Sequence, residues 1–219
     1  MCRSSCWRSR PILIWSKELQ ANGALVFQDV IKDRHARKCA EMGVDGIIAV
    51  GAGAGGHTGD LSPFALMQEI RAWWDGLLIL SGCIATGRSV LAAEVLGADL
   101  AYIGSAFLAS EEANTQPGFK QMIVESSAKD ISLTNSFTGV NANFLTPSIV
   151  ANGLDPAELL RPARGDISIS GGGLNRKAWR DIWSAGQGIG AIARSQPAAD
   201  YIDWLAADYS SARAVMGMS

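Results

Sequence analysis

Short apolar segments and helical segments alternate between residues 24 and 105, at a repeat of roughly 25 to 30 residues. The apolar segments are mostly apolar throughout rather than alternating, which is typical of strands in a parallel sheet that is covered on both faces. Successive βα units follow from this pattern, and two architectures share it: a doubly wound sheet and a (β/α)8 barrel. The predicted strands are 24–30, 46–50, 77–80 and 100–103.

Helices are predicted between these strands and after them. Ser62-Pro63 is a good helix start, with serine as the cap and proline in the first turn. Asn22-Gly23, Gly43 and Gly97 are helix-stopping signals. The predicted helices are 16–21, 33–42, 64–74, 88–96, 111–129 and 197–214, and residues 11–15 are compatible with a further strand.

Composition limits the classes of protein to consider. The chain has 219 residues, 48% of them hydrophobic, and a formal net charge of −2. This predicts one globular domain, with no basic surface for nucleic acid and no apolar run of about 18 residues for a membrane span. Residues 1–14 have no helical or strand period, so we expect a disordered or aberrant start and a folded domain at 15–219. The four cysteines are scattered, which predicts neither a metal site nor a disulfide framework and fits a reducing cytoplasm.

Three loops follow three successive predicted strands. The first, residues 51–59, holds five glycines and His57; the others are residues 81–87 and Gly104-Ser105. The carboxyl ends of parallel strands meet at one edge, where loop amides and helix N-termini can bind a phosphate. Each glycine loop could instead be only a tight βα turn, but three at one edge favour a ligand site.

Single residues give weaker signals. His57 lies within a glycine loop, which favours a role as general base or hydrogen-bond donor, whereas His35 lies in a charged helix and is expected at the surface. Asp45 and Asp99 each precede a strand and are expected to cap turns. Cys83 has no base near it in the sequence and is interpreted as a small loop residue. Trp179 and Trp183 are four residues apart and could face a pocket together.

The chain has no P-loop lysine and no G-x-G-x-x-G that opens a helix, so ATP and classical dinucleotide sites are not indicated. Five other segments form a recognisable set: Gly51-Ala-Gly-Ala-Gly-Gly-His-Thr-Gly59, Ser81-Gly-Cys-Ile-Ala-Thr-Gly87, Leu96-Gly-Ala-Asp99, Tyr102-Ile-Gly-Ser-Ala-Phe107 and Trp179-Arg-Asp-Ile-Trp-Ser-Ala-Gly-Gln-Gly188. Together they resemble the nitronate monooxygenase family, formerly called 2-nitropropane dioxygenases. The resemblance covers nearly everything from residue 15 to the end and corresponds to the C-terminal part of the family.

The resemblance implies an FMN-dependent (β/α)8 barrel that oxidises alkyl nitronates with molecular oxygen, giving a carbonyl compound and nitrite. His57 would stand beside the flavin, where it could orient a nitronate oxygen or remove the α-proton of a nitroalkane. It also implies that this chain carries about four βα units, the second half of the barrel, with a helical C-terminal extension, and that the first half is missing. The implied FMN-binding residues are Gly55, Gly56, Gly82, Cys83, Gly104 and Ser105.

Two positions depart from the family pattern. Gly53 stands where many relatives have glutamate, and Cys83 replaces the second glycine of a Gly-Gly-Ile turn. Three alternatives remain open: the monooxygenase, a flavin-dependent enoyl-acyl-carrier-protein reductase that would also need a nicotinamide donor, and a truncated, inactive fragment. A half barrel leaves two sheet edges unpaired, and pairing with a second copy would complete it.

Overall fold

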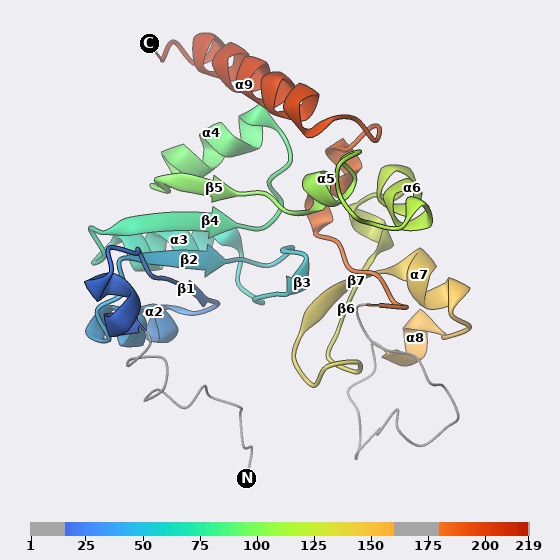
Figure 1. Ribbon diagram of the computed structural model, residues 1–219, viewed down its shortest axis with the longest axis horizontal. Helices are drawn as coiled ribbons and strands as arrows, with labels where there is room; N and C mark the ends of the chain where they lie inside the picture. Colours follow the sequence, from blue (N-terminus) through green and yellow to red (C-terminus); the bar gives the residue numbers. More distant parts are fainter. Residues whose placement is uncertain (1–15, 160–179, 219) are drawn as a thin grey trace.

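The computed structural model describes residues 16–159 and 180–218, and its centre is a four-stranded parallel sheet (Figure 1). The strand order is β1-β2-β4-β5, with every neighbouring pair parallel. An α/β fold with a parallel sheet is therefore confirmed, whereas the half-barrel interpretation stays a prediction. The strands are β1 (Phe27–Val30), β2 (Gly46–Val50), β4 (Leu77–Ser81) and β5 (Leu100–Tyr102).

One face of this sheet packs on three helices. They are α2 (Asp33–Glu41), α3 (Pro63–Arg71) and α4 (Gly87–Val95), and a further helical turn at 16–21 precedes β1. Helix α4 begins with a capping box, because the Thr86 hydroxyl accepts from Ser89 N and the Ser89 hydroxyl accepts from Thr86 N. The core between sheet and helices includes Val30, Ile47, Ala49, Leu66, Met67, Ile70, Leu78 and Leu80.

The opposite face of the sheet is not uniformly covered, although the apolar strands predict cover on both faces. Leu100 and Tyr102 of β5 are 56% and 57% exposed, whereas Ile79 of β4 is 8% exposed. Strand β5 is the last strand of the order, so it has a neighbour on only one side. The position of β5 at the edge, which the strand sequences do not encode, decides this difference.

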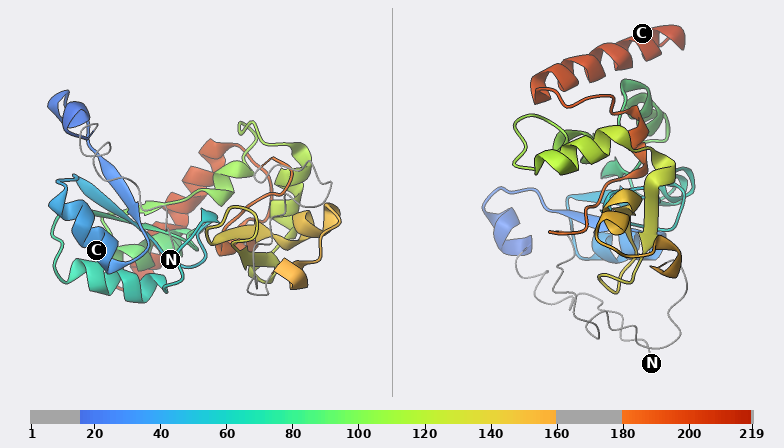
Figure 2. Two further views of the ribbon diagram at one scale, coloured as in Figure 1. Left: turned by 90° about the horizontal axis from the view of Figure 1, so that it is seen from below. Right: turned by 90° about the vertical axis from the view of Figure 1, so that its right-hand side faces the viewer.

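A second, antiparallel sheet lies beyond the carboxyl ends of the parallel strands (Figures 1 and 2). Its order is β3-β7-β6, formed by β3 (Gly56–His57), β7 (Ala142–Leu145) and β6 (Ile131–Thr134). The part of the chain after the parallel strands, predicted as a helical extension, therefore also contains two strands, β6 and β7. Polar residues hide these strands in the sequence, because Ser132, Thr134 and Asn143 are buried there despite their polarity.

Several element boundaries also differ from the predictions. Strand β1 begins at Phe27 rather than at residue 24. The helix predicted at 111–129 is only α6 (Pro117–Glu125), followed by the 3-10 turn η1 (Ala128–Asp130). Gln116 has ψ 139°, as expected for a residue before proline, so the helix cannot start earlier. The predicted strand at 11–15 lies outside the described residues.

The remaining helices follow β5 along the chain. They are α5 (Ser105–Leu108), α7 (Thr146–Ala151), α8 (Pro156–Leu159), the 3-10 turn η3 (Gln187–Ala191) and the long α9 (Ala198–Val215). Helix α9 lies against α4 (Figure 1, red and green). It is held there partly by Asp208, whose carboxylate accepts from Arg88 N at 2.9 Å. Within the described residues, no helix is both long and apolar enough to cross a membrane.

Two aspartates hold the amino ends of two pairs of neighbouring strands in the same way: Asp45 joins β1 and β2, and Asp99 joins β4 and β5. The Asp45 carboxylate accepts from Val26 N at 2.7 Å, and the Asp99 carboxylate accepts from Leu78 N at 2.8 Å. The backbone N–H groups of both aspartates donate back to the carbonyls of the same partners, Val26 and Leu78. The prediction that both residues are structural caps is confirmed.

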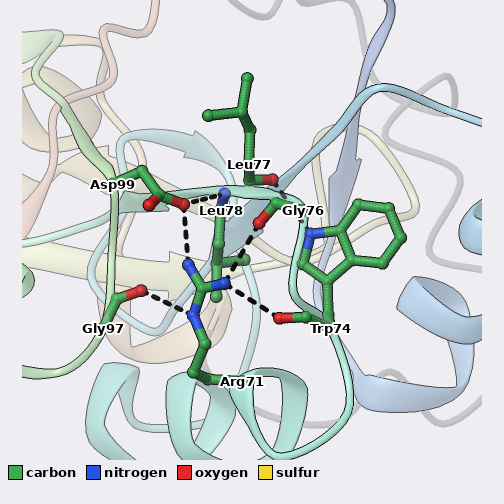
Figure 3. A network of polar contacts seen from close by, with 7 residues as sticks. All are labelled: Arg71, Trp74, Gly76, Leu77, Leu78, Gly97 and Asp99. Carbon is green, nitrogen blue, oxygen red and sulfur yellow. Dashed lines mark hydrogen bonds and ion pairs between the residues drawn. The ribbon is translucent and has the colours of Figure 1, made fainter.

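Arg71 ties Asp99 to three backbone carbonyls (Figure 3). Its Nη2 contacts the Asp99 carboxylate at 2.7 Å, and its Nε donates to the Gly97 carbonyl at 2.8 Å. Its Nη1 donates to the carbonyls of Trp74 and Gly76. This network lies at the amino ends of β4 and β5, the edge of the sheet opposite the glycine loops.

We expect Asp99→Asn to lower the free energy of unfolding by about 1–2 kcal/mol near neutral pH, because a charged hydrogen-bonded group is lost. Burial raises the pKa of Asp99, but the hydrogen bonds from Leu78 and Arg71 outweigh it and leave that pKa below its usual 3.8. The stabilisation is therefore complete above the unfolded pKa, about 4, and is lost as the pH falls through the folded pKa.

Urea unfolding at a series of pH values tests this. Asp99→Asn should show a shallower loss of stability below about pH 4 than the unmodified chain. The exposed Asp75 gives the matched control, and Asp75→Asn should leave the free energy of unfolding near neutral pH unchanged. Equal acid slopes for Asp99→Asn and the unmodified chain would contradict the prediction.

Candidate functional site

A cavity of about 310 Å³ lies where β2, β4 and β5 end. Four chain segments line it: residues 53–56, residues 81–85, residues 102–108 in part, and residues 184–188 in part, with Phe119 at one side. Its volume is at the lower end of the range for small-molecule sites, about 300–1,000 Å³. The three loops predicted to form a site are therefore brought together at one cavity.

The first of these segments, the glycine loop, is held from both sides. Gly51 N donates to the Ser81 carbonyl at 3.0 Å, and the buried Thr58 hydroxyl donates to the Gly51 carbonyl at 3.0 Å. Gly53 and Gly56 have φ of +89° and +73°, a backbone region that side chains with a Cβ rarely adopt. The glycines therefore serve the loop conformation as well as the approach of a ligand.

The fourth segment, Ser184 to Gly188, is not predicted from the sequence as part of a site and contributes there only to the family resemblance. Gln187 N donates to the Gly53 carbonyl at 2.8 Å, and Gly186 N donates to the Ser105 hydroxyl at 2.9 Å. A methyl group on Gly186 would lie 2.7 Å from the Gly53 carbonyl oxygen. The segment thus packs backbone to backbone on the glycine loop, and its small residues were the signal that could have revealed it.

All six predicted cofactor-binding residues line the cavity. Gly82 and Cys83 lie in the turn after β4, with φ of +122° and +60°, and Cys83 is the one non-glycine residue with positive φ in the described part of the chain. A Cβ on Gly104 would meet no atom within 4 Å, so open space lies above that residue. The set is Gly55, Gly56, Gly82, Cys83, Gly104 and Ser105.

The Ser105 hydroxyl is oriented for a further contact. Its oxygen already accepts from Gly186 N, so its own hydrogen remains available to donate. The ionisable groups among the lining residues are the Cys83 thiol and the Tyr102 phenol. Neither group can carry a positive charge, and burial raises the pKa of the Cys83 thiol, so this thiol is neutral near pH 7. An anion in this cavity would therefore be held by N–H and O–H donors.

His57 lies beside this cavity rather than in its lining. It is the second residue of β3, pairs with Ala142 of β7, and directly follows the lining residue Gly56. Its side chain is exposed, and it lies with the loops at the carboxyl end of the parallel strands. The catalytic role predicted for His57 is compatible with this position and stays a prediction.

Other candidate residues lie elsewhere. His35 is half-buried on α2 and does not line the cavity; burial and the nearby Arg34, Lys32 and Lys38 lower its pKa. Trp183 stacks on the lining residue Phe119, with ring centroids 5.0 Å apart, so it supports the wall from behind. Trp179 lies outside the described residues.

The cavity fits the phosphate end of a flavin mononucleotide on its own chemistry. Glycine turns after β4 and β5 expose backbone N–H groups, the Ser105 hydroxyl can donate, and the space above Gly104 has no side chain in it. The planar part of such a ligand would need apolar or aromatic cover, and Tyr102, Leu108 and Phe119 line the same cavity.

Comparison with known proteins gives a consistent relationship. The model of a family described as nitronate monooxygenase matches residues 13–208. A nitronate monooxygenase of Paraburkholderia phytofirmans is 29% identical over 200 residues, which cover 84% of this chain and 54% of that protein. The chain thus spans about half the length, or less, of the first curated relatives that it matches.

Two solved structures resemble the chain over 93% of its length. One is FabK from Thermotoga maritima, with a TM-score of 0.74 and 27% identity, of which the chain covers 67%. The other is the nitroalkane oxidase from Streptomyces ansochromogenes, also with a TM-score of 0.74 and 27% identity, of which the chain covers 62%.

Proposed function

The chain belongs to the nitronate monooxygenase family, and on this basis we propose that it binds FMN in the cavity at the carboxyl ends of its parallel strands. We further propose that it oxidises alkyl nitronates with molecular oxygen to a carbonyl compound and nitrite. The observation that carries the proposal is the convergence of four glycine-containing segments on one cavity, where backbone N–H groups and the Ser105 hydroxyl can donate. A bound flavin would supply the electron transfer.

In this proposal the chain's own residues bind and orient. Gly82, Cys83 and Gly104 offer backbone N–H groups to the phosphate, and the Ser105 hydroxyl adds a donor whose direction Gly186 sets. Gly55 and Gly56 let the glycine loop approach the flavin closely. The similarity to the nitroalkane oxidase of Streptomyces ansochromogenes supports nitro compounds as the substrate class.

His57 is the proposed catalytic residue. It directly follows the lining residue Gly56 and its side chain is exposed, so the proposal places its imidazole beside a ligand bound above the glycine loop. There it would donate a hydrogen bond to a nitronate oxygen, or remove the α-proton of a neutral nitroalkane.

The proposal has three further parts. The first is a cytoplasmic location, and the second is pairing with a second copy to complete a barrel. The third is the division of the chain into residues 1–14 and a partial barrel domain at 15–219.

The visible absorption spectrum of the purified chain, before and after addition of FMN and removal of the excess, tests the cofactor. We expect flavin absorbance to be retained and oxygen uptake with propyl nitronates to follow. We expect His57→Ala to keep the flavin and to lose about 100-fold or more of kcat, because a positioned acid or base contributes about 10²–10⁴-fold. His35→Ala is the matched control and should leave both the bound flavin and kcat unchanged.

The same experiment separates the alternatives. A chain that stays colourless after FMN would contradict the proposed cofactor and favour the inactive fragment. A coloured chain that ignores nitronates but oxidises a nicotinamide donor with an enoyl thioester would favour the reductase. Unchanged nitronate turnover in His57→Ala would contradict only the catalytic role of His57, and not the proposed cofactor or reaction.

A further inference from the structure

Asn143 of β7 is a buried polar residue that the proposed reaction does not use. It is 1% exposed and lies opposite Gly56 of β3 and Leu133 of β6 in the antiparallel sheet. Its Nδ2 donates to the Ala54 carbonyl at 2.8 Å, across 89 positions of sequence. The side chain therefore reaches from the second sheet into the glycine loop.

A second connection runs from the backbone of Asn143. Its carbonyl accepts from the Ser184 hydroxyl, and the oxygen of that hydroxyl accepts from Gly56 N at 2.7 Å. Asn143 thus fastens the glycine loop on both sides of Gly55, directly at Ala54 and through Ser184 at Gly56. The next residue along the chain is His57 of β3, which lies opposite Ala142 of β7 in the ladder.

The side chain of Asn143 makes this contact at a cost. Its Oδ1 is the buried side-chain N or O atom that lacks a hydrogen-bond partner in the described part of the chain. The opposite amide orientation would place an oxygen against the Ala54 carbonyl, so the observed orientation is the better of the two. An unpaired buried acceptor lowers the stability of the fold. The contact with Ala54 is what the amide adds.

We propose that Asn143 is the positioning residue of the glycine loop and thereby fixes the place of His57. A loop with positive φ at Gly53 and Gly56 has many accessible conformations when nothing outside it selects one. Asn143, Ser184 and the β3–β7 pairing supply that selection from a separate part of the fold. The inference concerns the same site as the proposed function, and only its flavin measurement depends on that function.

The two histidines of the chain allow a direct test by NMR of their imidazole protons. Asn143→Asp keeps the volume of the side chain but replaces the donor that faces Ala54, and Asn143→Ala removes it. We expect both variants to shift the His57 signals and to leave those of His35 on α2 unchanged. FMN should bind about tenfold or more weakly, because small displacements of positioned groups are costly.

Ser132→Ala is the matched control. Ser132 is buried at 6% exposure on the adjacent strand β6, and its hydroxyl contacts the Thr146 hydroxyl at 2.8 Å rather than the glycine loop. Ser132→Ala should shift the NMR signals of neither histidine. His57 signals that stay unchanged in folded Asn143→Ala, or that move equally in Ser132→Ala, would overturn the inference. If Asn143→Asp fails to fold, Asn143→Ala decides, and if the unmodified chain binds no FMN, the NMR signals still decide.

Discussion

Replacement of Gly104 by leucine is expected to leave the chain folded and to raise the dissociation constant for FMN by at least about 100-fold, or ~2.7 kcal/mol. A Cβ at this position meets no atom within 4 Å, and its φ of −115° is open to any residue. Gly104 also lines the cavity, so the added side chain would occupy the space proposed for the phosphate. The free energy of unfolding should change by less than about 0.5 kcal/mol.

Two further variants make this result specific. Gly104→Ala should give a smaller loss of FMN affinity than Gly104→Leu, because less of the space is filled. Gly190→Ala is the control outside the cavity: its Cβ would lie 3.6 Å from the nearest atom, an ordinary contact, and FMN affinity should not change. Fluorescence titration of FMN measures all three. Wild-type affinity in a folded Gly104→Leu would place the phosphate elsewhere.

Gly87→Ala is expected to have the largest effect on stability. A methyl group there would lie 2.1 Å from the Tyr209 nitrogen and 2.4 Å from the Leu205 carbonyl oxygen of α9. Both atoms belong to the backbone, so no side chain can turn aside and α9 must move. We expect a loss of about 3 kcal/mol or more, and a fall of Tm by about 6–12 °C.

The displacement of α9 should also reach the cavity. The buried Tyr201 hydroxyl of α9 donates to the carbonyl of the lining residue Ala85 at 2.9 Å, and burial raises the pKa of Tyr201 to about 12. We therefore expect Gly87→Ala to weaken FMN binding together with stability. Thermal unfolding followed by circular dichroism measures the first effect, with Gly104→Ala as the tolerated comparison. A Tm within about 2 °C of the unmodified chain would contradict the close packing of α4 and α9.

Much of the parallel half of the fold could be predicted from the sequence. Its strands are short apolar runs, and signals such as Gly43 and Gly97 end the helices between them, so each unit is visible within roughly 30 residues. Asp45 and Asp99 could be recognised as caps because each acts on the start of an adjacent strand. The glycine loops could be placed at one edge because parallel strands share a direction.

The second sheet and the fourth lining segment could not be predicted in this way. Strand β3 has only two residues, Gly56 and His57, and becomes a strand because β7 pairs with it from far along the chain. Asn143 is a polar residue, which favours a loop when the sequence is considered alone. Its side chain is nevertheless 1% exposed, because its contacts in the folded chain bury it. The hydrophobic periodicity of a segment indicates whether that segment is buried, but it does not indicate which distant segment covers it.

The sequence by itself therefore determined the βα order, the edge at which a ligand would bind, and the glycines that such an edge needs. Only the tertiary structure decided that Ser184 to Gly188 closes the cavity, that Asn143 fastens the loop before His57, and that Leu100 and Tyr102 stay exposed. The physical reason is the range of the interactions. Strand and helix propensities act within a few residues, whereas backbone contacts such as that of Gln187 with Gly53 join segments that meet only after the chain has folded.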